Sequence, residues 1–245
     1  MATDILALED VVAGYGKMTI LHGATCTVAR GAITTVIGPN GAGKSTMFKT
    51  IFGMLPARSG RVLFEGAEIT NLAPRDLLAR GISYVPQGRN IFPELSVRHN
   101  LELGAVMAPA GFDLLGRMEA AMARFPVLRR KADQQASTLS GGEQKILEIA
   151  RALLLEPKLM LVDEPSIGLS PIMVNELFAV LTEMRDRGIT VLLIEQNAKR
   201  ALESSDYGIV LELGRTRIAD TAKSILSDPR IGQLFLGGGL QEKVA

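Results

Sequence analysis

The sequence predicts an α/β fold in which a main β-sheet is joined by a small N-terminal antiparallel sheet and by a helical insertion. Apolar runs of strand length occur at residues 32–37, 82–85, 159–162 and 190–194, and helical spacing follows several of them. The first part of the chain has short strands joined by turns, whereas a long middle segment has helical spacing without strands. These patterns favour one α/β domain over residues 1–245.

The N-terminal strands are expected at residues 5–12, 24–28 and 61–64. Glycine-containing turns are expected at residues 30–31 and 59–60, directly before strands. Short strands separated by such turns pair most simply as antiparallel neighbours. We therefore expect them to form the small sheet beside the main one.

A glycine-rich loop follows the apolar run 32–37 and precedes the opening of a helix at residues 47–52. Its residues are Gly38, Pro39, Asn40, Gly41, Ala42, Gly43, Lys44, Ser45 and Thr46. A strand, a G-x-x-x-x-G-K-[ST] loop and a helix in this order predict a phosphate site, because glycines let backbone N–H groups approach phosphate oxygens. Lys44 would place its charge on the β- and γ-phosphates, and Ser45 would offer its hydroxyl to Mg²⁺.

A helical subdomain is predicted at about residues 88–154, after the strand 82–85 and Pro86-Gln87. Its helices are short and lack sustained heptads, which excludes a coiled-coil arm. The last of these helices starts after Ser140 and is ended by Pro157. The small residues Ser140, Gly141 and Gly142 expose N–H groups that suit an anion, although a simple helix cap is the alternative.

Two carboxylates, Asp163 and Glu164, follow the apolar strand 159–162. Ligands of open α/β sheets bind beyond the carboxyl ends of strands, so these carboxylates are expected to face the same site as the phosphate loop. Asp163 would hold Mg²⁺ through its water shell, and Glu164 would polarise the attacking water. A solvated acidic strand end is the simpler alternative.

The rest of the chain continues the α/β alternation. A long helix is expected from Pro171 to about residue 187, and Gly188 would stop it. The strand 190–194 ends in Glu195-Gln196-Asn197. Two further strands at 207–212 and 215–219, two short helices and a mobile tail at 237–245 complete the expectation.

Composition narrows the class of protein. The chain is 47% hydrophobic and 22% charged, which is ordinary for a globular domain, and its net charge of +1 gives no electrostatic case for nucleic acid. The single cysteine, Cys26, excludes an internal disulfide and fits a reducing compartment. Neither a signal peptide nor an apolar run of membrane-spanning length is apparent. A cytosolic protein is expected, with any membrane role through a partner.

In their order along the chain, these motifs resemble the ATP-binding cassette (ABC) ATPases, P-loop NTPases with a RecA-like core. The resemblance covers essentially all 245 residues. Residues 38–46 are similar to the family's Walker A motif, residues 160–164 to its Walker B motif and residues 139–142 to its signature motif. Glu143 departs from the pattern, because glutamine is commoner at that place.

The resemblance implies further roles within a site for ATP and Mg²⁺. Tyr15 stands where an aromatic ring stacks on adenine, and Gln87 where a glutamine touches Mg²⁺ and the water while facing the membrane partner. Ser140, Gly141 and Gly142 would complete the nucleotide site of a second cassette, in trans. Gln196 stands where most members have a histidine. Its amide can still bond the γ-phosphate, although a strand-end residue without a role is the alternative.

One branch matches more closely, the second ATP-binding subunit of branched-chain amino acid importers (LivF-like). The matching segments are residues 84–93, 139–144, 166–171, 194–197 and 235–238. Glutamine at position 196 is the most informative match, because that branch typically carries it. Importers of urea and short amides share the pattern, so the substrate stays open.

This resemblance implies an ATP-hydrolysing subunit that is peripheral at the cytoplasmic face of a bacterial inner membrane. Its implied partners are integral-membrane permease subunits, a second ABC ATPase subunit as a heterodimer (or a homodimer in isolation) and a periplasmic solute-binding protein, with no nucleic acid. Two alternatives remain from other classes. One is a soluble ABC protein of translation or DNA maintenance, and the other is a nucleotide-binding regulatory module without turnover.

Overall fold

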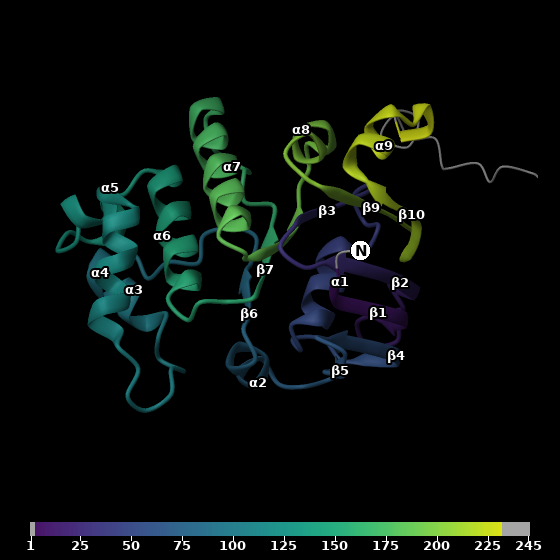
Figure 1. Ribbon diagram of the computed structural model, residues 1–245, viewed down its shortest axis with the longest axis horizontal. Helices are drawn as coiled ribbons and strands as arrows, with labels where there is room; N and C mark the ends of the chain where they lie inside the picture. The colour runs from purple at the N-terminus through teal and green to yellow at the C-terminus, as the bar shows by residue number, and fades with distance from the viewer. Residues whose placement is uncertain (1–2, 232–245) are drawn as a thin grey trace, which may run out of the picture.

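Two β-sheets organise the chain in the computed structural model, which describes residues 3–231 (Figure 1). The larger sheet has six strands in the order β10-β9-β3-β8-β7-β6. All neighbouring pairs from β9 to β6 are parallel, and only the edge strand β10 is antiparallel. These strands are β3 (Ile33–Ile37), β6 (Ile82–Val85), β7 (Leu159–Asp163), β8 (Thr190–Ile194), β9 (Tyr207–Glu212) and β10 (Arg215–Thr221).

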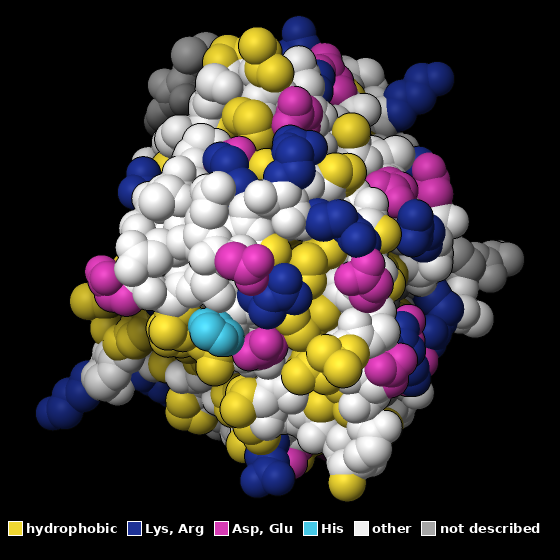
Figure 2. Space-filling model, turned by 90° about the vertical axis from the view of Figure 1, so that its left-hand side faces the viewer, with side chains coloured by type: hydrophobic (Ala, Val, Ile, Leu, Met, Phe, Trp, Pro, Cys, Tyr) yellow, Lys and Arg dark blue, Asp and Glu magenta, His cyan; other side chains and the backbone are white. Residues whose placement is uncertain are grey.

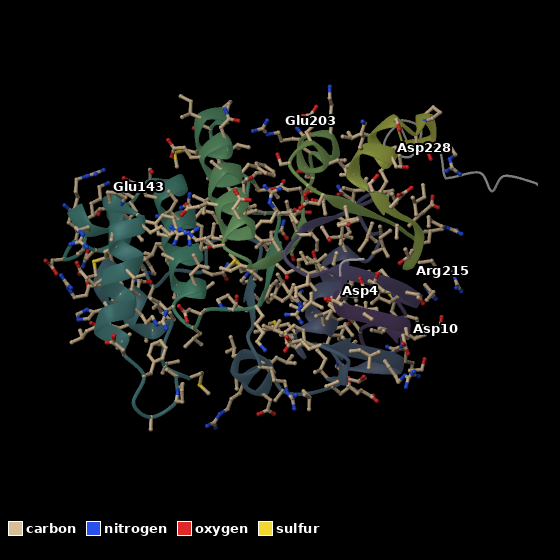
Figure 3. All side chains as sticks on the ribbon, in the orientation of Figure 1. Asp4, Asp10, Glu143, Glu203, Arg215 and Asp228 are labelled. Atoms are coloured by element: carbon tan, nitrogen blue, oxygen red, sulfur yellow. The ribbon has the colours of Figure 1, made fainter. Side chains whose placement is uncertain are left out.

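The smaller sheet is antiparallel and has the order β2-β1-β4-β5. Its strands are β1 (Asp4–Ala13), β2 (Leu21–Ala29), β4 (Ala57–Phe64) and β5 (Ala67–Glu68). It adjoins the larger sheet where β2 meets β10, and Figure 3 shows Asp10 of β1 and Arg215 of β10 at this same edge of the molecule. The predicted pair of sheets is therefore confirmed.

The helices divide into three groups along the chain. α1 (Lys44–Ile51) follows the phosphate loop, and α2 (Pro74–Ala79) precedes β6. Helices alone fill the segment between β6 and β7: α3 (Val97–Leu103), α4 (Leu114–Arg124), α5 (Pro126–Arg130), a 3₁₀ turn (Ala136–Thr138) and α6 (Gly141–Leu153). α7 (Pro171–Asp186), α8 (Ala198–Glu203) and α9 (Ala222–Ser227) follow β7, β8 and β10. In Figure 1 α3–α6 lie at the end opposite the antiparallel sheet.

Alternating side chains of β7 serve two of the three hydrophobic cores in the described residues. Leu159 and Leu161 of β7 pack in one core with α1 and the antiparallel sheet. Met160 and Val162 of the same strand pack in the other core with α3–α7. Successive side chains of a strand point to opposite faces, and here both faces are covered, so β7 reads as a continuous apolar run.

Several local expectations needed correction. The turn predicted at residues 59–60 is wrong, because both residues lie within β4. Gly60 has φ +82° there, and a Cβ on it would lie 2.4 Å from the Asp10 carbonyl oxygen. This glycine therefore lies opposite a bulge of β1, where two residues face one residue of β4. β2 starts three residues before its expected start at residue 24, and α5, α8 and the strand β5 had not been expected. The predicted tail 237–245 and the match at 235–238 lie outside the described residues.

Candidate functional site

The phosphate loop, residues 38–43, connects the carboxyl end of β3 to the first residue of α1. Gly38 passes so close to β9 that a Cβ on it would lie 2.0 Å from the Leu211 carbonyl oxygen. Gly41 and Gly43 have φ values of +80° and +104°, which L side chains rarely adopt. Gly43 is also the N-cap of α1. The glycines are therefore required by close approach and by backbone conformation.

Gly214, in the turn between β9 and β10, holds this loop from behind. Its N–H donates to the Ala42 carbonyl oxygen at 2.9 Å, and its own carbonyl oxygen accepts from His22 N–H of β2 at 2.9 Å. A Cβ on Gly214 would lie 1.8 Å from the Ile20 carbonyl oxygen. One glycine thus joins the loop to both sheets.

A cavity of about 500 Å³ opens in front of the loop. Beyond the loop, its walls come from residues that follow β6, β7 and β8, strands far apart in the sequence. The lining residues are Ile20, Asn40, Gly41, Gly43, Lys44, Ser45, Thr46, Gln87, Glu164, Ile167 and Gln196. The structure therefore brings most of the loop together with the predicted Gln87, Glu164 and Gln196.

Lys44 is the cation of this cavity. Its side chain is 7% exposed, and its Nζ donates to the carbonyl oxygens of Gly38 and Pro39 at 2.9 and 3.1 Å. Burial lowers the pKa of Lys44, while the nearby Glu164 and Asp163 act in the opposite direction. The ammonium group is thus held against the loop by neutral carbonyl oxygens, from which an anionic phosphate can attract it.

Asp163 lies at the end of β7, behind the cavity wall. The Tyr84 hydroxyl donates to its Oδ2 at 3.2 Å, and Ser45 Oγ lies 3.4 Å from its Oδ1. Burial raises the pKa of Asp163, although both hydroxyls counteract that effect. Ser45 and Asp163 together present hard oxygen donors of the kind that Mg²⁺ prefers. Tyr84 was expected only as a strand residue, and its contact depends on the pairing of β6 with β7.

Glu164 has a left-handed backbone, with φ +47°, which is uncommon outside glycine. Its N–H donates to the Ile194 carbonyl oxygen of β8 at 2.8 Å, and this bond supports the turn. Gln87 Nε2 donates to Glu164 Oε2 at 2.8 Å. Burial and the adjacent Asp163 raise the pKa of the Glu164 carboxyl group, while Lys44 lowers it. The strained turn directs this carboxylate into the cavity.

Besides Asp163 and the loop residues Gly38, Pro39 and Ala42, four predicted residues do not line this cavity. Tyr15 is 46% exposed, with Lys49 Nζ 5.8 Å from its ring centroid. Ser140 is the N-cap of α6 and forms a capping box with Glu143 (labelled in Figure 3), so the cap alternative is observed in the single chain. Gly141 and Gly142 form the first turn of that helix, and Gly142 packs against Met173 of α7.

A second cavity, of about 400 Å³, lies among the ends of α4, α6 and α7. It contains five cations, but each already pairs with a carboxylate. The pairs are Arg30 and Lys158 with Glu65, Arg117 with Glu156, and Arg124 and Arg187 with Glu183. None of the predicted site residues lines it. The cavity at the phosphate loop is therefore the candidate site.

The parallel sheet, the glycine loop at a helix N-terminus and the buried acidic strand end define a P-loop nucleotide-hydrolysing protein. The model of the ABC transporter family matches residues 21–167. The chain belongs to this family, and ATP binding and hydrolysis are the activity of its cassettes.

Curated relatives resemble the chain over nearly its whole length. One relative is the high-affinity branched-chain amino acid transport ATP-binding protein BraG of Pseudomonas aeruginosa, which is 41% identical to this chain. The aligned region covers 96% of this chain and 100% of BraG. A probable branched-chain amino acid transport ATP-binding protein LivF of Archaeoglobus fulgidus is 39% identical, covering 92% and 95%. A lipopolysaccharide export ATP-binding protein LptB of Escherichia coli is 32% identical, covering 97% and 98%.

Solved structures agree with the fold. The ADP conformation of an ATP-binding cassette of an ABC transporter superposes with a TM-score of 0.85 at 33% identity, covering 96% of this chain and 99% of that one. A nucleotide-free cassette gives a TM-score of 0.84 at 32% identity, covering 95% and 98%. The predicted P-loop core with its antiparallel subdomain and helical insertion is thereby confirmed.

We expect Lys44→Ala to abolish nearly all nucleotide affinity and turnover, because it removes the cation that the loop places beside the phosphates. Equilibrium binding of ATP and steady-state phosphate release are the measurements. Lys199→Ala is the matched control, since that side chain is exposed on α8, 4.0 Å from Glu203. Wild-type binding and turnover in Lys44→Ala would contradict this location of the site.

Proposed function

We propose that this chain is the ATP-hydrolysing subunit of an importer for branched-chain or related amino acids. The cavity that joins the phosphate loop to Gln87, Glu164 and Gln196 carries the hydrolytic part of the proposal. The relatives support the substrate class, since two of those named for branched-chain amino acid transport reach 41% and 39% identity, whereas a third, named LivG, reaches 32% and the LptB proteins reach 30–32%.

In this proposal the loop and Lys44 bind the triphosphate. The N–H groups of the loop and of the α1 N-terminus face the phosphate oxygens, and the helix dipole adds to their attraction. Lys44 exchanges its carbonyl partners for the β- and γ-phosphates. Tyr15, exposed beside the loop, stacks on the adenine, a contact worth about 0.5–1.5 kcal/mol.

Mg²⁺ fits the oxygen donors of this site. Ser45 and Asp163 would hold it, and Gln87, which lines the same cavity as Ser45, would be a further ligand. Residues 3–231 contain no group of three or more His, Cys, Asp or Glu side chains suited to a metal, so the substrate phosphates would complete the ligand set. When bound, the ion would neutralise charge on the phosphate oxygens.

Glu164 acts as the general base for the attacking water. Its left-handed turn directs the carboxylate into the cavity, and Gln87 holds one of its oxygens. Gln196 follows β8 and lines the opposite part of the same cavity. Its amide can donate to the γ-phosphate without carrying a proton, so it would sense that phosphate by position.

We also propose that two cassettes pair, so that Ser140, Gly141 and Gly142 of one chain complete the site of the other. A second ABC ATPase subunit or a second copy would serve as the partner. These three residues begin α6 and lie apart from the cavity of their own chain, which is compatible with a role in trans. The capping box uses the N–H groups of Ser140 and Glu143 and fixes the start of α6, where Gly141 and Gly142 would face the partner's nucleotide.

The helical segment, about residues 88–154, is the proposed contact with integral-membrane permease subunits. Figure 2 shows the end of the molecule formed by these helices, where hydrophobic side chains gather among side chains of both charge signs. Exposed apolar residues of this segment include Phe92, Val106, Met107 and Leu115. No helix in residues 3–231 is long and apolar enough to span a membrane. A peripheral subunit at the cytoplasmic face, served by a periplasmic solute-binding protein, fits this proposal.

We expect sealed vesicles that contain the complete transporter to accumulate leucine, isoleucine or valine when ATP is supplied. The complete transporter consists of this chain, its permeases and its solute-binding protein. Urea and acetamide test the importers that share the motif pattern, and the Lys44→Ala complex is the inactive control. Uptake of urea without uptake of any branched-chain amino acid would contradict the proposed substrate class.

Glu164→Gln should retain ATP binding but hydrolyse ATP slowly, because the amide keeps the size of the side chain and loses the base. The expected loss in turnover is about 10²–10⁴-fold, and closed cassette pairs should accumulate in ATP. Glu176→Gln, exposed on α7, is the matched control. Turnover at the parental rate in Glu164→Gln would show that another group activates the water.

Gln196→Ala should slow turnover in the assembled transporter and leave ADP affinity nearly unchanged, because ADP has no γ-phosphate to sense. Gln196→His should remain active, since an imidazole N–H can replace the amide donor. Turnover and ADP binding are measured side by side, with the exposed Gln134→Ala as control. Full activity in Gln196→Ala would refute the sensor role, whereas equal losses of ADP and ATP affinity would indicate general damage to the site.

A further inference from the structure

Glu195 is a buried carboxylate that the proposed hydrolysis leaves without a role. It follows the last residue of β8 and directly precedes Gln196, and it is 2% exposed. In the sequence it stands out only as part of the Glu195-Gln196-Asn197 match. Burial of a carboxylate costs free energy unless hydrogen bonds or a charge partner satisfy its oxygens.

Both carboxylate oxygens of Glu195 are used. Oε1 accepts from the backbone N–H of Ser166 at 3.0 Å. Oε2 accepts from the Ser166 hydroxyl at 2.6 Å and from the backbone N–H of Gln196 at 3.2 Å. Within residues 3–231 no lysine or arginine pairs with Glu195, so these three donors are its stabilising partners.

These donors belong to two segments that both reach the nucleotide cavity. Ser166 lies two residues after Glu164, and the next residue, Ile167, lines the cavity. Gln196 lines the same cavity from the end of β8. A backbone bond from Glu164 N–H to the Ile194 carbonyl oxygen connects the same two segments, at 2.8 Å. The Glu195 side chain thus connects the same two segments as the backbone hydrogen bond between Glu164 and Ile194.

We propose that Glu195 is a positioning residue that fixes Gln196 relative to Glu164, and thereby sets the γ-phosphate sensor against the general base. The inference rests on the roles proposed above for Gln196 and Glu164. Glu195 itself does not line the nucleotide cavity. Its carboxylate holds the Gln196 backbone and the Ser166 segment at a fixed separation, which a loose strand end would not maintain.

Glu195→Gln removes one of the three hydrogen bonds that the Glu195 carboxylate accepts. The amide oxygen can still accept from Ser166 N–H, and the amide nitrogen can donate to the Ser166 hydroxyl oxygen. The same nitrogen, however, faces the Gln196 N–H donor and cannot accept from it. In the opposite amide orientation the oxygen accepts from Gln196 N–H, but the nitrogen then faces Ser166 N–H and cannot accept from it. In either orientation the variant keeps the size of the side chain and loses one of the three hydrogen bonds that hold the two segments together.

The test is steady-state ATP turnover of Glu195→Gln, Gln196→Ala and the double variant in the complete transporter, with ADP affinity and thermal unfolding measured beside it. Glu195→Gln should lose about tenfold or more in kcat, as expected for a charge-assisted hydrogen bond. Its KM for ATP and its ADP affinity should change less than about threefold. The double variant should be no slower than Gln196→Ala, because both changes act through one group.

Parental turnover in Glu195→Gln, or multiplied losses in the double variant, would overturn the proposal. If Glu195→Gln does not fold, Ser166→Ala carries the same test, since it removes only the hydroxyl contact with Oε2, and its loss must also be non-additive with Gln196→Ala. Glu164→Gln distinguishes a failure of the positioning role from a failure of the proposed hydrolytic site. If Glu164→Gln and Gln196→Ala are slow while Glu195→Gln is not, only the positioning role fails. A fully active Glu164→Gln would instead refute the proposed hydrolytic site.

Discussion

Parallel pairing of β3, β8, β7 and β6 is the constraint on which the site depends. Parallel strands place their carboxyl ends at one edge of the sheet, so whatever follows each strand must meet there. The phosphate loop follows β3, Glu195 and Gln196 follow β8, Glu164 follows β7 and Gln87 lies two residues beyond β6. Four segments separated by up to about 150 positions thus form one cavity without any local sequence signal between them.

The same edge concentrates ionisable groups that the fold alone does not require. Burial raises the pKa of Asp163, of Glu164 and of Glu195, and it lowers the pKa of Lys44. Glu164 in addition adopts a left-handed backbone. Such groups destabilise a fold unless hydrogen bonds or a ligand offset the cost. Here Tyr84, Ser166 and Gln87 supply part of that compensation, and bound ATP with Mg²⁺ would complement the remainder.

The two hydrophobic cores that share β7 connect this site to distant parts of the chain. One core joins α1 to the antiparallel sheet, and the other joins α6 and α7 to the helical segment. β7 contributes alternate side chains to both and ends in Asp163. The buried pair Lys145–Glu148 of α6 also reaches the backbone after Gln87, through Gly88 and Asn90. α6 is therefore hydrogen-bonded to the segment that contains Gln87, whose amide donates to Glu164.

The sequence by itself determined the local devices, because each rests on neighbouring residues. The glycine loop at residues 38–46, the acidic end of the strand at 163–164 and the helical character of the middle segment follow from spacing and from residue type. The same local logic failed at Gly60, where a glycine that resembles a turn lies inside β4 opposite a bulge of β1, because the residue it meets, Asp10, lies fifty positions away.

Only the tertiary structure decided the contacts made across strands. Gly214 holds the phosphate loop because β9 lies beside β3, and Tyr84 meets Asp163 because β6 lies beside β7. Glu195 reaches Ser166 because β8 lies beside β7. Strand order in a parallel sheet is set by the packing of helices on both of its faces, a sum of many distant burial terms. Periodicity and short motifs along the chain do not report which distant residues are buried against one another. The roles of these residues could therefore be recognised only from the order of the strands in the folded structure.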